Sequence, residues 1–339
     1  MSLVSIVVPC RNEIKYISNL LNSIKDSDYP QLSIEIIVVD GMSDDGTRDL
    51  ITNDFIRDSS NIKLLDNIKQ KTPFAFNLGI KSSKGEYIII LGARHVISRN
   101  YISQAVDTLK SNKEIGCLGG VVKNIFENKT SEIISSAMAS PFGVGFSNFR
   151  TCNKDSFVDS IGSPCFRMEI FNEIGYFDER LSRNQDDDYS YRVINAGYKI
   201  LLKANISVQY NVRASFKNLF TQYRQYGYWK VFVNKKHNSV TTMRQLFPMF
   251  LILSIFLLTF LSFFNLGFIY LLGFELALYT LLSLYFSVKD NGFNIKNGIM
   301  QMYTCLTLHI SYGFGYLEGI YDFILLDRLP NQKNEKLSR

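Results

Sequence analysis

The stretch IEIIVVDGMSDDGT, residues 34–47, decides the fold predicted for the N-terminal part of the chain. Its first half is a run of apolar, mostly β-branched residues, which is typical of a strand buried in a parallel sheet. The run stops at Asp40, and a loop of small and acidic residues then leads into a helix. Residues 4–8, 62–65 and 87–91 are similar short runs. Their alternation with helical patterns predicts an α/β domain that binds ligands at the carboxyl ends of its strands.

Polar or turn-forming residues follow the first two of these strands: Pro9, Arg11 and Glu13, then Asp40, Ser43 and Asp45. An acid directly after a strand is well placed to hydrogen-bond a ribose hydroxyl or a base edge. Read alone, however, Asp45-Gly46-Thr47 is more simply a turn and a helix cap. The sequence has neither GxGxxG nor GxxxxGK[ST], so we expect a nucleotide site that is neither a dinucleotide fold nor a P-loop.

The chain becomes strongly apolar after residue 245. Leu246–Val288 contains a single charged residue, Glu275. Because a membrane span needs about 20 apolar residues, this segment predicts two spans, at about 246–265 and 268–288. We therefore expect an α/β domain at residues 1–235 and a membrane-associated region at 236–339.

A third apolar helix is expected at about residues 299–326. Polar or small residues recur along it at helical spacing, so it either packs in the membrane or lies in the interface. Basic residues flank both of its ends. The positive-inside rule then favours an interfacial or re-entrant helix, because it prefers both ends in the cytoplasm.

Charge and cysteine content indicate the compartment and the partners. The net charge is +6, which suits an anionic membrane surface and phosphorylated ligands. No basic run carries a nucleic-acid-binding motif, so nucleic acid is not expected as a partner. The five cysteines are scattered without metal-ligand spacing, as in a reduced cytosolic domain. The apolar segments lie too far along the chain for a signal peptide. We expect an inner (cytoplasmic) membrane protein whose N-terminal domain faces the cytoplasm.

The stretch RNQDDDYSYR, residues 183–192, concentrates negative charge between two arginines. Carboxylates this close repel one another, so we expect at least one of them to have a raised pKa or to be recruited by a cation. The alternative is a solvated helix N-terminus, since Asn184 or Asp186 can cap a helix and acids suit its first turn. The pattern by itself does not separate a catalytic site from a cap.

Several motifs together resemble the inverting family 2 glycosyltransferases: VVPCRNE (7–13), VDGMSDDGT (39–47) and NLGI (77–80). Three others narrow the resemblance to the succinoglycan-type glycosyltransferases of bacterial exopolysaccharide assembly: SPFGVG (140–145), FDERL (177–181) and YGYWK (226–230). The resemblance covers about residues 3–235. It implies a GT-A fold with a mostly parallel central sheet, followed by membrane helices.

The resemblance also implies roles for individual residues. The nucleotide pocket would be lined by Pro9, Arg11, Glu13 and Asp40, with Ser43 and Asp45 supporting the loop and Lys71 and Asn77 near the donor. Gln185-Asp186 stands at the family's Glu-Asp pair, which makes Asp186 the general base; Asp187 and Asp188 would orient neighbours or cap the helix. The family's later element, which closes over the diphosphate and the acceptor sugar, would be formed by Gln222, Arg224 and Trp229. Aromatic residues around Trp229 either stack on a sugar or lie at the membrane interface.

One position departs from the family pattern. Members carry Asp-x-Asp or Asp-x-His after the strand at 87–91, and these acids hold a divalent cation, Mg²⁺ or Mn²⁺, on the donor diphosphate. Here the chain reads Gly92-Ala93-Arg94-His95, and neither Gly nor Arg supplies the oxygen that a hard cation requires. Arg94 can pair with the diphosphate itself. Alternatively, His95 is a ligand beside another acid, although a lone histidine is more often structural, or the site has lost its activity.

The sequence thus predicts a membrane-anchored, inverting glycosyltransferase with weak or absent metal dependence. The expected donor is a nucleotide-sugar, with UDP favoured because the family mostly uses it, and the expected acceptor is a hydroxyl of a lipid-linked saccharide. Membrane lipid and other polysaccharide-assembly proteins are expected partners. One alternative is a processive polysaccharide synthase, for which two or three helices are too few to form a channel. Another is a non-catalytic scaffold, which Gly92 favours and Asp186 opposes.

Overall fold

A computed structural model describes residues 1–57, 60–126, 128–144, 154–211, 215–241, 243–291 and 294–330. Its contacts divide the chain into two compact units. Unit 1 comprises Met1–Ile125 and Asn148–Asn211, and unit 2 comprises Phe126–Ser147 and Val212–Arg339. This division differs from the boundary expected at residue 235, because the helices at 129–144 and 216–236 pack with the C-terminal helices. Gly145 and Cys152 lie outside the described residues.

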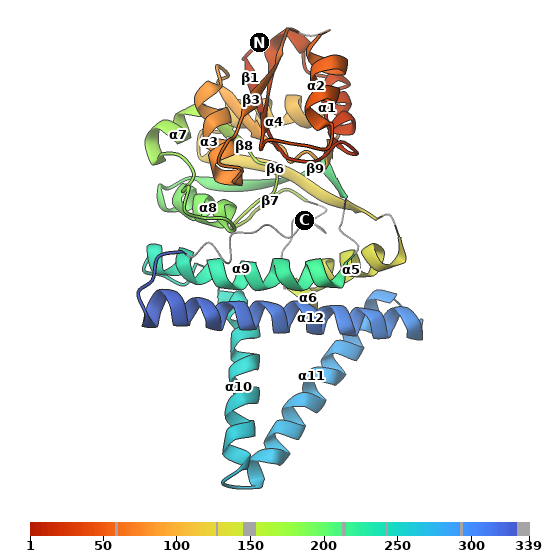
Figure 1. The fold of residues 1–339 in the computed structure, drawn as a ribbon. Coiled ribbons are helices and arrows are strands. Elements are labelled where there is room, and N and C mark those ends of the chain that lie inside the picture. Colours follow the sequence, from red (N-terminus) through yellow and green to blue (C-terminus); the bar gives the residue numbers. More distant parts are fainter. Residues whose placement is uncertain are drawn as a thin grey trace. The chain divides into compact units, whose positions relative to one another are not determined.

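Unit 1 is built on one mixed sheet in the order β3-β2-β1-β4-β8-β6-β9-β5, with β7 paired to β9 (Figure 1). Its strands are β1 Val4–Cys10, β2 Ile34–Asp40, β3 Ile62–Asp66, β4 Tyr87–Ile90, β5 His95–Ile97, β6 Ile115–Ile125, β7 Ser156–Phe157, β8 Cys165–Arg167 and β9 Lys199–Asn211. The expected mostly parallel arrangement holds for β3-β2-β1-β4 and for β6 with β9. It fails where β8, β5 and β7 insert antiparallel to their neighbours.

Alternating side chains of the strands supply two apolar layers, because successive strand residues point to opposite faces. Val4, Ile6 and Val8 of β1 pack with α1 and α4, whereas Val7 packs on the other face with α3, α7 and α8. The helices of unit 1 are α1 Ile17–Lys25, α2 Thr47–Ile51, α3 Thr72–Ser82, α4 Tyr101–Ser111, α7 Met168–Ile174 and α8 Gln185–Asn195. A β-carbon at Gly79 of α3 would lie 2.3 Å from a Val7 methyl, so α3 lies directly on β1.

Unit 2 is helical in its described residues. Its helices are α5 Lys129–Ala139, α6 Pro141–Val144, α9 Phe216–Lys236, α10 Phe247–Ser262, α11 Gly267–Asn291 and α12 Ile295–Gly319, which continues as η5 Ile320–Leu325. Small residues let α9 and α12 approach closely: a β-carbon at Gly315 would lie 1.9 Å from the Arg224 carbonyl oxygen, and one at Gly227 would lie 2.1 Å from that of Tyr312. The small face predicted for the third apolar helix is therefore its packing surface.

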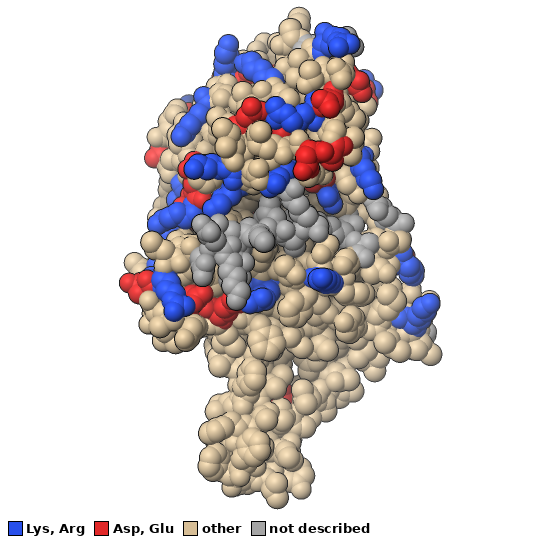
Figure 2. Space-filling model, viewed as in Figure 1, with Lys and Arg blue, Asp and Glu red and all other residues tan. Residues whose placement is uncertain are grey.

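Two helices are long and apolar enough to cross a membrane among the residues that the structure describes. They are Met243–Ser262, with a mean hydropathy of 2.1, and Gly267–Asp290, with 1.7. They coincide with the spans expected at about 246–265 and 268–288, and little of either is buried. Figure 2 shows an almost uncharged surface over this part of unit 2. These features fit membrane association.

Candidate functional site

The loops that follow β1 and β2 are held together by a set of reciprocal hydrogen bonds. The two strands pair in parallel with Cys10 opposite Asp40, so the loops leave the sheet side by side. Asn12 and Asp44 exchange two bonds, of 2.8 and 3.0 Å. The Glu13 amide donates to the Thr47 hydroxyl at 3.0 Å, and the Gly41 amide donates to the Cys10 carbonyl at 2.7 Å. Positive φ angles at Asn12 and Met42 complete the two turns.

Asp40 lies under these loops as a fully buried carboxylate. It accepts hydrogen bonds from the Ser43 amide, at 2.9 Å, and from Arg48 Nη1, at 2.7 Å. Arg48 also donates to Asp66 at 2.8 Å, and these two carboxylates raise its pKa. Sequence reasoning missed Arg48, whose one signal is its place in the first turn after the acidic loop. Both Asp40 carboxylate oxygens already have protein partners. A direct bond from Asp40 to the base or ribose would have to share an oxygen with them, and it stays a prediction.

Ser43 and Asp45 have the supporting positions that the resemblance implies. The Ser43 hydroxyl accepts from the Asn12 amide at 2.8 Å. Asp45 accepts from the amides of Thr47 and Ile14 at 3.0 and 3.2 Å. Partial burial acts to raise the pKa of Asp45, but these hydrogen bonds outweigh it and lower the pKa. Asp45 is thus a loop-forming cap as well as part of the motif.

Arg11 has a buried polar atom without a hydrogen-bond partner in the described part of the chain. Its side chain runs over Gly41, where a β-carbon would lie 3.1 Å from Arg11 Cδ. The Arg11 Nε is buried and has no hydrogen-bond partner among the described residues. Buried donors without partners are uncommon in folded proteins. Pro9, at the end of β1, is half-buried, and the place of Pro9 and Arg11 at a nucleotide pocket stays a prediction.

Glu13 and Arg94, both predicted site residues, form an ion pair. Arg94 Nε donates to Glu13 Oε2 at 2.7 Å, and the guanidinium lies over the Tyr16 ring, 4.8 Å from its centre. Burial acts to lower the pKa of Arg94, but the Glu13 hydrogen bond outweighs it, so the pKa is raised. The two Nη groups make no hydrogen bond within the part of the chain that the structure describes. Glu13 therefore orients the Arg94 guanidinium, which stays positively charged. Its two Nη groups (the outer fork) are left to bind another anion.

His95 is held by hydrogen bonds to its ring nitrogen Nδ1. Its Nδ1 accepts from the Gly92 amide at 3.0 Å and lies 3.0 Å from the Ser163 hydroxyl, so this nitrogen is occupied. A β-carbon at Gly92 would lie 3.3 Å from the imidazole, which leaves little room for an aspartate there. No group of three His, Cys, Asp or Glu side chains suits a metal among the described residues. The donor set around positions 92–95 does not fit a divalent cation.

Burial of the His95 imidazole should make the stability of the fold depend on pH. Burial lowers its pKa from 6.5 to about 4. The unfolded chain therefore binds more protons than the folded chain between these values, so stability falls as the pH drops from 6.5 towards 4, by up to about 3 kcal/mol. We expect His95→Gln to remove this part of the pH dependence in thermal unfolding of the detergent-solubilised protein. His237→Gln is the control; equal pH profiles for wild type and His95→Gln would contradict the prediction.

Asn77 and Lys71 were both expected near the donor, and the structure gives them different surroundings. Asn77 is buried, and its amide group exchanges hydrogen bonds with the backbone of Phe177 at 2.9 and 3.0 Å and donates to Glu179 at 2.9 Å. It ties α3 to the FDERL motif and does not face open space, which corrects its predicted role. Lys71 precedes α3 and is half-buried, so its predicted place near the donor remains open.

The acidic stretch forms the first turn of α8. Asp188 is fully buried and pairs with Arg192 at 3.2 Å. Arg192 also donates to the carbonyl oxygens of Ile174 and Tyr176, at 2.7 and 2.8 Å. The Asp188–Arg192 pair therefore anchors α8 to the C-terminal end of α7. Asp186 is exposed and Asp187 half-exposed in the same turn. Beside them, Gln185 Oε1 is a buried acceptor with no donor among the described residues, a feature that the sequence did not reveal.

The remaining predicted residues belong to unit 2. Trp229 is fully buried against Tyr228, Phe232 and Phe323. The ring has no exposed face for a sugar in this structure, which disfavours the stacking alternative for Trp229. Gln222 donates to the Tyr226 hydroxyl at 2.8 Å within α9. Arg224 forms an ion pair with Glu318 of α12 at 2.7 Å.

Comparisons with known proteins identify the class. The model of glycosyl transferase family 2 matches residues 5–175, half of the chain. The chain belongs to this family and is a glycosyltransferase with a GT-A-like fold. It is 29% identical over 94% of its length to a dolichyl N-acetyl-alpha-D-glucosaminyl phosphate 3-beta-D-2,3-diacetamido-2,3-dideoxy-beta-D-glucuronosyltransferase of Methanococcus voltae, 98% of which is covered.

Two further similarities support the family and the fold. The chain is 29% identical to the succinoglycan biosynthesis protein ExoA of Rhizobium meliloti, over 72% of this chain and 74% of that protein. The mannosyltransferase PcManGT of Pyrobaculum calidifontis, solved in complex with GDP-Man and Mn²⁺, superposes with a TM-score of 0.58 at 15% identity. That match covers 94% of this chain and 87% of the other, and it shows the fold alone.

Proposed function

We propose that this glycosyltransferase inverts the anomeric centre as it moves a sugar from a nucleotide-sugar to a hydroxyl of a lipid-linked saccharide. The observation that carries the proposal is Asp186. Its carboxylate is exposed in the first turn of α8, and the helix behind it is anchored by the buried Asp188–Arg192 pair. An exposed carboxylate on a fixed support can accept the proton of an incoming hydroxyl.

Inversion requires that the acceptor oxygen attack the sugar opposite the leaving diphosphate. Asp186 would remove the hydroxyl proton as the new glycosidic bond forms, a contribution of about 10²–10⁴-fold. Gln185, whose buried oxygen lacks a donor among the described residues, would accept a second hydroxyl of the same sugar. Asp187 would line the acceptor side of the site.

The departing diphosphate must be stabilised by positive charge. In many transfer reactions this stabilisation contributes more to the rate than the general base does. Arg94 would provide it with its outer fork, because a guanidinium pairs with phosphate oxygens in bidentate geometry. Glu13 holds the Nε side of the guanidinium. The pocket for the nucleotide would be completed by Arg11, by Lys71 and by the loop that Asp40, Ser43 and Asp45 support.

The donor and the acceptor are proposed from the relatives and from the spans. We favour a UDP-sugar. The relative from Methanococcus voltae is named for a dolichyl-linked glycosyl phosphate acceptor, and helices α10 and α11 would hold this enzyme at the same surface as such a lipid. Tethering raises the effective concentration of the acceptor. The catalytic unit would face the cytoplasm at the inner membrane, where other polysaccharide-assembly proteins would supply and remove the saccharide.

The test is nucleotide release by the purified, detergent-solubilised protein with a panel of nucleotide-sugars and a membrane extract as acceptor. We expect turnover that survives EDTA and that falls about 10²–10³-fold in Arg94→Gln, the size typical of losing one charge-stabilising donor. Arg94→Lys, which keeps the charge but loses the fork, should be intermediate. Turnover abolished by EDTA would show that a cation does this work. Nucleotide-sugar binding without turnover for any donor would favour a non-catalytic scaffold.

A further inference from the structure

Helix α12 has an apolar surface that the proposed reaction does not use. Exposed apolar residues recur along it and its extension at intervals of three to four positions, with a longer interval on each side of Phe314: Ile295, Ile299, Tyr303, Leu306, Phe314, Tyr321 and Leu325. This spacing places them on one stripe of the helix. The stripe lies apart from the buried residues Gly315 and Gly319, which are four positions apart and pack against α9.

The orientation of this stripe is set by contacts inside unit 2. A β-carbon at Gly313 would lie 2.4 Å from the Pro248 carbonyl oxygen, so α12 packs directly on the start of α10. Figure 1 shows α12 running across the ends of α10 and α11, which extend away from it. If those two helices cross a bilayer, α12 lies along its surface, at the depth of the lipid phosphates.

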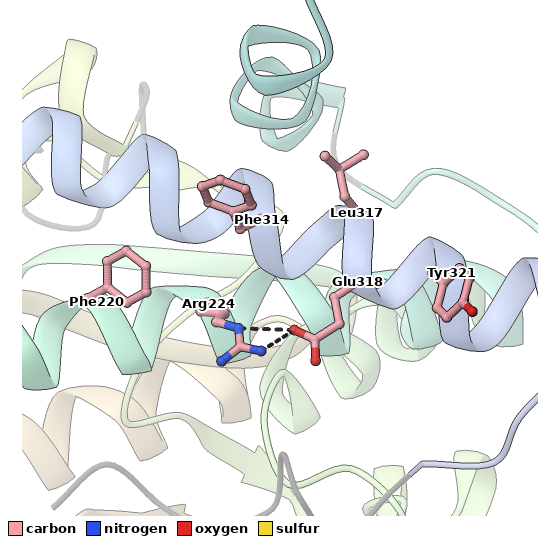
Figure 3. A pocket seen from close by; sticks show the side chains of 6 residues that line it. All are labelled: Phe220, Arg224, Phe314, Leu317, Glu318 and Tyr321. Atoms are coloured by element: carbon pink, nitrogen blue, oxygen red, sulfur yellow. Dashed lines mark hydrogen bonds and ion pairs between the residues drawn. The ribbon is translucent and has the colours of Figure 1, made fainter. Parts of the chain in front are cut away.

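A groove opens beside this stripe. It is open to solvent, has a volume of about 540 Å³ and is lined by Phe220, Arg224, Phe314, Leu317, Glu318 and Tyr321 (Figure 3). Arg224 lies on α9 and Glu318 on α12, and Nε and Nη2 of Arg224 both donate to one Glu318 oxygen, at 3.0 and 2.7 Å. The third nitrogen, Nη1, has no hydrogen bond within the described ranges. One wall of the groove is therefore apolar, and the partly exposed Arg224 guanidinium lines the groove beside that wall.

This combination matches a lipid phosphate better than a soluble anion. A guanidinium pairs well with phosphate oxygens, whereas aromatic and aliphatic side chains recognise hydrocarbon. Inorganic phosphate would make no use of Phe314 or Leu317, and a nucleotide would have no aliphatic chain to place on Leu317. The acceptor of the proposed reaction carries both groups in one molecule, because its saccharide is joined through phosphate to a lipid.

We propose that the α9–α12 groove binds the lipid carrier of the acceptor, with Arg224 on its phosphate and Phe220, Phe314 and Leu317 on the first part of its chain. The proposal rests on the proposed function. The carrier enters from the bilayer along the apolar stripe, and its phosphate displaces the Glu318 carboxylate from Arg224. Glu318 thus keeps Arg224 in place in the empty groove and weakens binding of the carrier.

The experiment measures lipid binding directly. Purified full-length protein in nanodiscs is titrated with a long-chain polyprenyl phosphate, and bound lipid is counted by native mass spectrometry. We expect Arg224→Gln to weaken binding about tenfold, the usual effect of losing a charge-assisted bond, and Glu318→Gln to strengthen it. A purely structural role for the ion pair would weaken binding in both variants. Arg244→Gln, an exposed arginine before α10, should change nothing.

Two further arms identify the ligand. Phe314→Ala should weaken binding of the polyprenyl phosphate, whereas Ile299→Ala, on the same stripe but away from the groove, should not. Phosphatidylglycerol and inorganic phosphate should fail to compete at matched concentration. Equal competition by phosphatidylglycerol, or unchanged binding in Arg224→Gln, would overturn the proposal. Lipid binding as expected with no sugar transfer from any donor would instead contradict the proposed function.

Discussion

Asp186→Asn should lower kcat by about 10²–10⁴-fold while leaving nucleotide-sugar binding intact. The amide has nearly the shape of the carboxylate but cannot accept the acceptor proton. Because Asp186 is exposed and Asp188 provides the buried anchor of α8, the substitution should not change the melting temperature. The measurement is nucleotide release at saturating donor, combined with calorimetric titration of the nucleotide-sugar.

Asp107→Asn is the matched control, because Asp107 is an exposed acid within α4. It should retain full activity. If Asp186→Asn kept wild-type kcat, the general base would be another residue, and the exposed acids at the start of α8 would be no more than favourable charges at a helix N-terminus. If donor affinity fell together with kcat, Asp186 would instead belong to the donor site.

Gly315→Leu should unfold or severely loosen unit 2. A β-carbon at Gly315 would lie 1.9 Å from the Arg224 carbonyl oxygen and 2.7 Å from its carbon. Both atoms belong to the backbone of α9, so rotation of a side chain cannot relieve the clash and the helices must separate. Overpacking usually costs about 1–3 kcal/mol, and a backbone clash should exceed that range. Thermal unfolding in detergent is the measurement.

Gly273→Leu is the control for this change. Gly273 lies in α11, and nothing lies within 4 Å of its added β-carbon. The same substitution there should be neutral or slightly stabilising, since leucine favours helix more than glycine does. Equal stability of the two variants would show that α9 and α12 are not packed through Gly315.

The loops after β1 and β2 were predictable in part, because the strand ends and the bonds within the second loop are local, whereas the bonds that join the two loops span more than 30 residues. Apolar runs define the two strands, parallel pairing brings their ends together, and short polar residues at Ser43 and Asp45 can satisfy backbone groups only a few positions away. The two spans were predictable for a similar reason, since length and hydropathy alone decide them.

The sequence by itself thus determined the family, the strand ends that bear the loops after β1 and β2, the acidic start of α8 and the two apolar helices. Only the tertiary structure decided that Glu13 orients Arg94, that His95 occupies the space beside Gly92, and that Arg48 joins Asp40 to Asp66. It also buried Trp229 and turned Asn77 inward. The physical reason is that most of these pairings join residues far apart in the chain, and a side chain's role there depends on which neighbour the fold places within hydrogen-bonding distance.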